Sequence, residues 1–261
     1  MRKILLRYVL GICLPFFLLS FSINEEDKVE EVQNKASTSI SLDSFSNLIY
    51  PQIDFGDDTL EQHVFRLALA GHAKLKKDSA LAKDSLLAVI DYSLSSTKKR
   101  LWVINLNTKK IVLNEWVAHG KNSGGEYARR FSNRGQSHMT SIGFMVTGEV
   151  YNGKHKSSLK LNGFEPYYNT NVHARGVVIH GANYVKPELA LSNIAMGRSY
   201  GCPAVRKGVN ELLIQTINDG VCLFAYYPHT SYLSRSKYVN YNGMVKVQKE
   251  LDNTDTNCDV P

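Results

Sequence analysis

The sequence predicts a mainly β domain with one late helix, preceded by a short helical segment. After Ser95, short runs rich in β-branched and aromatic residues recur between turn residues. In segments 59–94 and 209–219, apolar residues instead recur at roughly helical spacing. The chain has 261 residues, of which 43% are hydrophobic, and this is enough for an ordinary globular core.

The N-terminal segment 1–22 has the pattern of a signal peptide. Basic residues precede an apolar run that ends at Leu19, and small Ser20 follows. We therefore expect export to the periplasm or cell envelope, with no stable membrane insertion after cleavage. An uncleaved N-terminal anchor is the alternative, because the run is close to the shortest length that spans a bilayer.

Charge and cysteine content bear on the partners and the thiols of the chain, but they do not identify its function. The formal net charge is +7, but no run of Lys and Arg interleaved with aromatic residues predicts a nucleic-acid partner. An exported chain can form disulfides, and Cys202, Cys222 and Cys258 are an odd set, so at least one should be a free thiol. Cys222 lies in an apolar run and is expected to be buried. Cys258 could pair with it only if the tail folds back.

The segments before the main domain are expected to be accessory. Segment 23–58 is rich in Asp, Glu, Ser and Asn, and we interpret it as a tether. Segment 59–94 predicts two amphipathic helices, interrupted near Gly71. The apolar positions behind this prediction are Leu60, Val64, Leu67, Leu75, Leu81, Leu86 and Ile90.

Segment 95–235 is expected to form the main domain. Two apolar runs within 100–120 flank the turn-like pair Asn107 and Thr108 and predict a hairpin. Further strands are predicted at 141–150, 176–180 and 221–227.

The late helix is predicted at 209–219. Leu212, Leu213 and Ile217 share one face of it, and Gly220 is placed to end it. The polar tail 236–261 is expected to be loosely held.

The densest group of chemically distinctive residues lies in segment 177–206. His180 ends an apolar run and precedes Gly181, so a strand should deliver an imidazole where the chain turns. Cys202 follows Gly201, which permits a tight turn, and precedes Pro203, which fixes the next φ. The turn should therefore hold the thiol both exposed and rigid.

A thiol and an imidazole in this arrangement predict nucleophilic catalysis. An ordinary thiol is only a few per cent thiolate at neutral pH, and a nearby imidazole that takes its proton produces a strong nucleophile for acyl transfer. Backbone N–H groups at the turn of Tyr200, Gly201 and Cys202 are candidates for an oxyanion hole. Arg206 is a candidate for binding a substrate carboxylate. No histidine pair has the spacing of a metal-binding helix, so a zinc peptidase is a poor fit.

The region resembles the L,D-transpeptidase catalytic domain (YkuD-like) family, and in particular its divergent murein L,D-transpeptidase branch. The resemblance covers about 90–228. It is carried, in order, by VAHGKNSGGEYARRFSN (117–133), SHMTSIGFMVTGEVYNGKH (137–155), SLKLNGFEP (158–166) and ARGVVIHGANYV (174–185).

The resemblance implies a β-sandwich-like catalytic domain that acts on the stem peptides of peptidoglycan. It implies Cys202 as nucleophile, His180 as base and the Gly181 carbonyl as the group that orients the imidazole. The family signature is Ser/Thr-His-Gly-Cys followed shortly by Arg. Here Ser199 is followed by Tyr200 where the family has its second His, and Arg206 falls later than the family Arg.

Further residues are expected on the substrate side of the site. The resemblance brings His119 and Ser123 near it, where they either contact substrate or form a structural turn. Ser199 is a further candidate for substrate binding, and Tyr184, just after the base, either lines the cleft or packs.

Several functions remain open at this point. The first is acyl transfer between stem peptides through a thioester on Cys202. A second is hydrolysis of the same thioester, giving an L,D-carboxypeptidase or endopeptidase. A third is a non-catalytic cell-wall-binding module with the same fold. A general cysteine peptidase has no support from any papain-like signature around Cys202.

Overall fold

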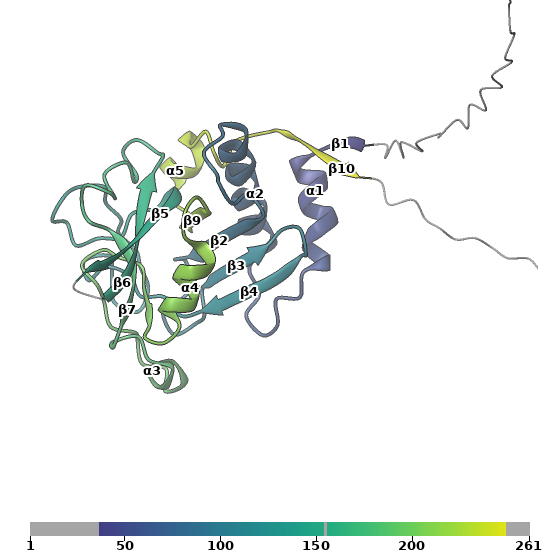
Figure 1. The fold of residues 1–261 in the computed structure, drawn as a ribbon. Helices are drawn as coiled ribbons and strands as arrows, with labels where there is room; N and C mark the ends of the chain where they lie inside the picture. The colour runs from purple at the N-terminus through teal and green to yellow at the C-terminus, as the bar shows by residue number, and fades with distance from the viewer. Residues whose placement is uncertain (1–36, 154–155, 249–261) are drawn as a thin grey trace, which may run out of the picture. The chain divides into compact units, whose positions relative to one another are not determined.

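The computed structural model describes residues 37–153 and 156–248 (Figure 1). The predicted signal peptide 1–22 and the cysteines Cys13 and Cys258 lie outside these residues. Within the described ranges, no helix combines the length and the apolar character that crossing a membrane requires.

One eight-stranded sheet organises the described chain, in the order β4-β3-β2-β9-β5-β6-β7-β8. The pairs β2–β9 and β7–β8 are parallel, and the other neighbours are antiparallel. The strands are β2 (Leu86–Asp91), β3 (Leu101–Asn105), β4 (Lys110–Glu115), β5 (Gly143–Gly153), β6 (Lys156–Gly163), β7 (Val178–Ala182), β8 (Ala204–Arg206) and β9 (Cys222–Tyr226). The fold is therefore mainly β, as predicted, and the β3–β4 hairpin lies where the turn residues indicated.

The sheet curls around its main core. Buried side chains from all eight strands belong to one apolar cluster with helix α4 (Asn210–Ile217). Beyond the end of β4, the Ala118 N–H donates to the Ala204 carbonyl at 2.8 Å and links the two edges of the sheet. The result is a barrel-like β arrangement, which agrees with the mainly β, β-sandwich-like domain that the resemblance implied.

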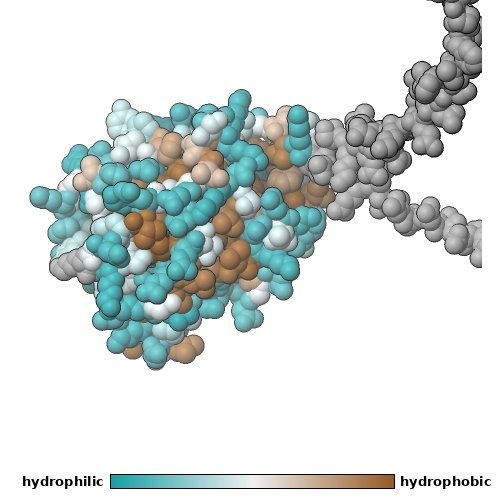
Figure 2. Space-filling model, in the orientation of Figure 1, coloured by the Kyte–Doolittle hydropathy of each residue, from teal (hydrophilic) through white to brown (hydrophobic). Residues whose placement is uncertain are grey.

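Helix α4 confirms the predicted late helix, with one change of face. Leu213, Ile214 and Ile217 are buried against the sheet, whereas Leu212 is 57% exposed. The prediction that Leu212 shares the buried face is therefore wrong, because four-residue spacing places Leu213 and Ile217 together. Figure 2 shows apolar surface over α4 and the β3–β4 hairpin. The exposed large apolar side chains there include Leu212 of α4 and Val112 of β4.

Helix α2 (Gln62–Lys77) covers the opposite face of β2 (Figure 1). It passes through Gly71 without a break, so the predicted interruption at this residue is wrong. A Cβ atom on Gly71 would lie 2.1–2.5 Å from the Phe144 ring. Gly71 therefore serves close packing between α2 and β5.

The second predicted helix of segment 59–94 is strand β2. Five of its six residues are fully buried, because one face meets the main core and the other meets α2. Strands buried on both faces have nearly continuous apolar sequences and lack the alternation that marks a strand. The apolar residues Leu86 and Ile90 were therefore misread as helical.

Parts of the predicted tether and of the predicted tail pair with each other in a two-stranded sheet. Strand β1 (Ser37–Ser41) pairs antiparallel with β10 (Met244–Gln248), and helix α1 (Leu42–Ile49) and the 3₁₀ turn η1 (Tyr50–Gln52) follow β1. Before β10, helix α5 (Thr230–Arg235) leads to the buried residues Tyr238 and Val239. Apolar residues scattered among polar ones were enough to anchor both segments.

Candidate active site

His180 lies within β7, beside β8. Its Cα pairs with that of Ala204 in the parallel ladder, and its side chain is buried. The Nδ1 atom lies 3.1 Å from the Gly181 carbonyl oxygen. Because a carbonyl only accepts, Nδ1 carries the proton in this contact, and Nε2 of the neutral ring is the atom that can take up a proton.

A small apolar cluster covers the outer face of β7 and β8. It includes Ala182, Ala204 and residues from α3 (Pro187–Leu191) and the loop after it. His180 and Ala182 share this face of the strand, since alternate residues point the same way. Gly181 points to the other face, where a Cβ atom would lie 2.7 Å from the Asn210 side chain.

Cys202 lies on a tight turn just before β8. Its Sγ accepts from the Val178 N–H at 3.5 Å and lies 3.8 Å from the Gly176 carbonyl oxygen. Val178 is two residues before His180 in β7, so the thiol contacts the backbone of the strand that carries the imidazole. Gly201 has φ +127°, a conformation that residues with a side chain rarely adopt.

The surroundings of the Cys202 thiol favour its protonated form. Burial raises its pKa, while the Val178 N–H and the nearby positive charge of Arg175 lower it to a smaller extent. Attack by sulfur therefore requires a base to remove the proton at the moment of reaction.

The turn that carries Cys202 is held by Ser199. The Ser199 Oγ donates to the Cys202 carbonyl at 2.7 Å and accepts from the Gly201 N–H at 3.0 Å. Ser199 is buried, and the contacts that the structure gives it shape the turn, while its role in substrate binding stays a prediction.

The predicted oxyanion donors require one correction. The Gly201 N–H is already bonded to Ser199, whereas the N–H groups of Tyr200 and Cys202 donate to no group in the described part of the chain. These two N–H groups are the candidates that remain.

Arg175 is a site residue that sequence reasoning missed. Its Nη1 donates to Ser132 O and Ser141 Oγ, and its Nη2 donates to Ser137 Oγ and Met139 O, at 2.6–3.2 Å. The Nη2 atom lies 3.3 Å from the position of a Cβ atom on Gly201. None of these four partners is a carboxylate, so the positive charge beside the Cys202 turn is not neutralised by them. The only signal in the sequence was its place in the segment that resembles the family.

Two tyrosines flank the thiol in different ways. Tyr184 is half-buried, and burial, followed by the charge of Cys202, raises its pKa to about 12. Tyr200 is 69% exposed, and the Lys121 ammonium lies 4.4 Å from its ring centroid. The His138 ring lies against the same tyrosine at 4.6 Å. Tyr200 therefore contributes an exposed aromatic surface beside Cys202.

Arg206 is not available as predicted. Its Nε and Nη2 atoms contact the Glu115 carboxylate at 2.8–3.2 Å, and Glu115 is buried. This bidentate pair joins β8 to the end of β4. The guanidinium that was expected to bind a substrate carboxylate is thus paired with an internal carboxylate, and its role towards substrate stays a prediction.

His119 and Ser123 form structure rather than a substrate surface. His119 is buried, and its Nδ1 accepts from Arg100 Nη2 at 2.8 Å. Burial, followed by the charge of Arg100, lowers the pKa of His119 to about 4. The Ser123 Oγ accepts from the Thr140 N–H at 2.9 Å and is buried. Of the two readings that the sequence left open for these residues, their burial and internal hydrogen bonds favour the structural turn.

Other reactive groups lie away from this site. Cys222 is fully buried in β9, as predicted, and burial strongly raises its thiol pKa. In residues 37–153 and 156–248, no group of three or more His, Cys, Asp or Glu is arranged to hold a metal ion.

Comparison with solved structures gives weak similarities to L,D-transpeptidases. An L,D-transpeptidase from Mycobacterium smegmatis aligns at 10% identity and a TM-score of 0.35, over 55% of this chain and 59% of that chain. The Ldtfm–avibactam carbamoyl enzyme aligns at 13% identity and 0.34, over 56% and 50%. An L,D-transpeptidase from Xylanimonas cellulosilytica aligns at 13% identity and 0.32, over 70% and 91%. This chain thus spans only about half to three fifths of the length of the first two.

Comparison by sequence is more specific. No curated protein matches the chain. A family model described as the L,D-transpeptidase catalytic domain matches residues 57–226, which is more than half of the chain. The resemblance seen in the sequence is confirmed, and the chain belongs to the L,D-transpeptidase catalytic domain family of enzymes.

Proposed function

We propose that the chain is an exported acyltransferase that acts on peptidoglycan stem peptides through a thioester on Cys202. The observation that carries this proposal is the pairing of Cys202 Sγ with the backbone of β7, the strand that also bears His180. The contact of Nδ1 with Gly181 O supports His180 as the base, because it leaves Nε2 to receive the thiol proton.

The first half-reaction forms the thioester. His180 takes the proton from the Cys202 thiol as the sulfur attacks a carbonyl carbon of the donor stem. The N–H groups of Tyr200 and Cys202 donate to the oxyanion that develops. The C–N bond then breaks, His180 returns the proton to the departing amine, and an acyl group remains on Cys202.

The second half-reaction resolves the thioester. An acceptor amine loses a proton to His180 and attacks the acyl carbon. The C–S bond then breaks, a new amide forms, and His180 returns the proton to the departing sulfur of Cys202. Water in place of the amine gives a trimmed stem instead, which is the L,D-carboxypeptidase or endopeptidase alternative. Both outcomes share one intermediate and differ only in which nucleophile reaches it.

Export belongs to the same proposal. The basic start and apolar run of segment 1–22 support secretion to the periplasm or cell envelope, where stem peptides occur.

The proposal is tested by mass spectrometry of products formed from a tetrapeptide-stem muropeptide. The wild type is compared with Cys202→Ala and His180→Ala. We expect a cross-linked or trimmed product from the wild type and none from either variant, and the product mass separates transfer from hydrolysis. Equal inactivity of all three proteins across several stems would favour a wall-binding module without catalysis.

A further inference from the structure

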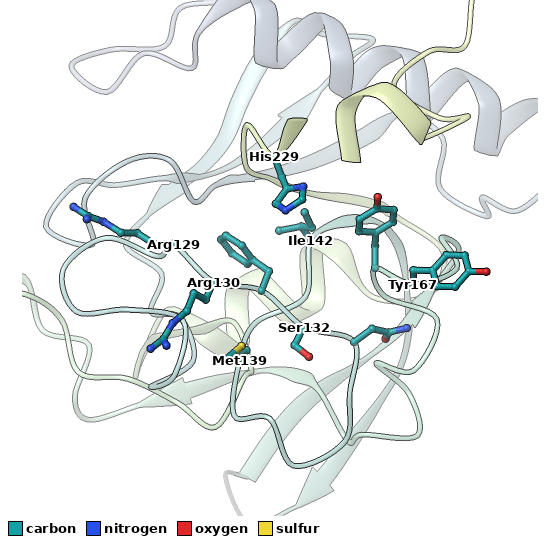
Figure 3. A pocket seen from close by; sticks show the side chains of 10 residues that line it. Arg129, Arg130, Ser132, Met139, Ile142, Tyr167 and His229 are labelled. Atoms are coloured by element: carbon teal, nitrogen blue, oxygen red, sulfur yellow. The ribbon is translucent and has the colours of Figure 1, made fainter. Parts of the chain in front are cut away.

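A cavity of about 440 Å³ is lined by residues that do not belong to the turn carrying Cys202 (Figure 3). It is formed by the loop of residues 129–142, the segment after β6 and the residue before α5. Its lining residues are Arg129, Arg130, Phe131, Ser132, Asn133, Met139, Ile142, Tyr167, Tyr168 and His229. None of these is acidic, so the cavity is positively charged.

The two arginines are free to bind an anion. Their side chains are exposed, and in the described part of the chain neither forms an ion pair or a side-chain hydrogen bond. Their backbones are nevertheless fixed, because both N–H groups donate to the carbonyl of buried Ser123 at 2.8–3.0 Å. A fixed backbone with unpaired guanidinium groups is suited to recognising carboxylates, which accept from arginine in a bidentate manner.

A further donor and an aromatic surface complete the cavity. His229 Nδ1 accepts from the Tyr232 N–H at 3.3 Å, so Nε2 carries the proton of the neutral ring and can donate. Tyr167 is 90% exposed and has φ +71°, which is an uncommon conformation for a bulky residue. In Figure 3, Arg129 and Arg130 lie on one side of the cavity and Tyr167 lies on the other, with their polar ends directed outward.

The cavity and the candidate active site share one loop. The carbonyl oxygens of Ser132 and Met139 accept hydrogen bonds from Arg175, which lies beside Gly201. Residues Ser132 and Met139 also line the cavity. A ligand in the cavity is thus separated from the Cys202 turn by a single layer of chain.

We propose that this cavity, the Arg129–Arg130 cavity, binds a carboxylate-bearing part of a peptide substrate that is remote from the bond that reacts. The inference depends on the proposed function for the identity of the substrate, since peptidoglycan stems carry several carboxylates. It assigns to Arg129 and Arg130 a role in substrate affinity and not in the chemical step.

The test compares two stem peptides that differ only in whether their carboxylates are free or amidated. The full chain is assayed beside Arg129→Gln/Arg130→Gln, the charge-preserving Arg129→Lys/Arg130→Lys, and Arg134→Gln. Arg134 is an exposed arginine on the same loop that does not line the cavity, so it is a matched control. We expect the double Gln variant to raise KM for the free acid about tenfold with kcat unchanged. The amidated peptide should show little change, and Arg129→Lys/Arg130→Lys should be intermediate.

Equal effects on the two peptides, or an equal effect of Arg134→Gln, would overturn the inference. Calorimetry of the free-acid peptide binding to Cys202→Ala separates this result from failure of the proposed function. If the wild type has no turnover but Cys202→Ala binds the free acid only when both arginines are present, the cavity assignment stands alone. If turnover depends on Cys202 but the affinity for the peptide is the same with and without the two arginines, the proposed function stands and the cavity assignment fails.

Discussion

Arg175 Nη2 donates a hydrogen bond to the Met139 carbonyl oxygen at 2.7 Å, and this contact fixes a positive charge beside the turn that carries Cys202. The guanidinium is held by three further acceptors, all neutral. Its charge therefore acts on the nearby thiol, whose pKa it lowers against the larger effect of burial.

Replacing Arg175 should raise the pKa of the Cys202 thiol. Alkylation by iodoacetamide depends on the thiolate, so its midpoint in Arg175→Gln should move to higher pH. Mass spectrometry of the peptide that contains Cys202 separates this thiol from the others. Arg175→Lys, which keeps the charge, should shift the midpoint less. An unchanged midpoint in Arg175→Gln would show that Arg175 only supports the loop.

Arg206 should matter for stability and not for substrate affinity. Arg206→Ala leaves the Glu115 carboxylate buried and unpaired, so we expect a loss of about 2–4 kcal/mol in the free energy of unfolding by urea. Arg206→Ala/Glu115→Ala should lose less than the sum of the single variants. If KM rises in Arg206→Ala while the unfolding midpoint stays the same, Arg206 contacts substrate after all.

Gly71 should tolerate no side chain. In Gly71→Ala, the new Cβ meets the Phe144 ring inside a packed interface, and we expect a loss of about 3 kcal/mol in unfolding free energy. Gly135→Ala is the matched control, because no heavy atom lies within 4 Å of its Cβ position. Similar thermal midpoints for the two variants would mean that α2 and β5 are less closely packed than described.

Stability should fall in mild acid partly because of His72. Burial, the largest cause, lowers its folded pKa from 6.5 to about 4. A lowered folded pKa gives stability that is complete above pH 6.5 and is lost as pH falls towards 4, since the unfolded chain binds the proton first. His72→Leu should reduce this loss by roughly 2–3 kcal/mol in urea unfolding.

The control for His72 is His173→Leu, which changes an exposed histidine. It should leave the pH dependence of unfolding unchanged. An identical acid slope in the wild type and His72→Leu would contradict the assignment.

Local signals predicted much of the fold, and they are also the basis for the candidate site. The β3–β4 hairpin, helix α4 and strand β9 each follow from turn residues or from spacing within about a dozen positions. Gly201 and Pro203 mark the turn that carries Cys202, whereas β7 continues through Gly181 to Ala182, so the turn expected after His180 is not present.

Features that depend on distant partners were not predictable in the same way. Strand β2 reads as helical because both of its faces are buried, by elements far apart in the chain. Arg206 looked like a substrate ligand because Glu115 lies 91 positions earlier in the sequence. Arg175 was missed because the hydrogen-bond acceptors that orient its guanidinium lie in residues 132–141, more than 30 positions earlier in the sequence.

The most direct test of the account is intact-protein mass spectrometry after exposure to an acylating β-lactam of the carbapenem class. We predict one covalent adduct, located on the peptide that contains Cys202, absent from Cys202→Ala and formed much more slowly by His180→Ala. An adduct that persists in Cys202→Ala, or no adduct in any of the three proteins, would contradict the assignment of Cys202 as the nucleophile.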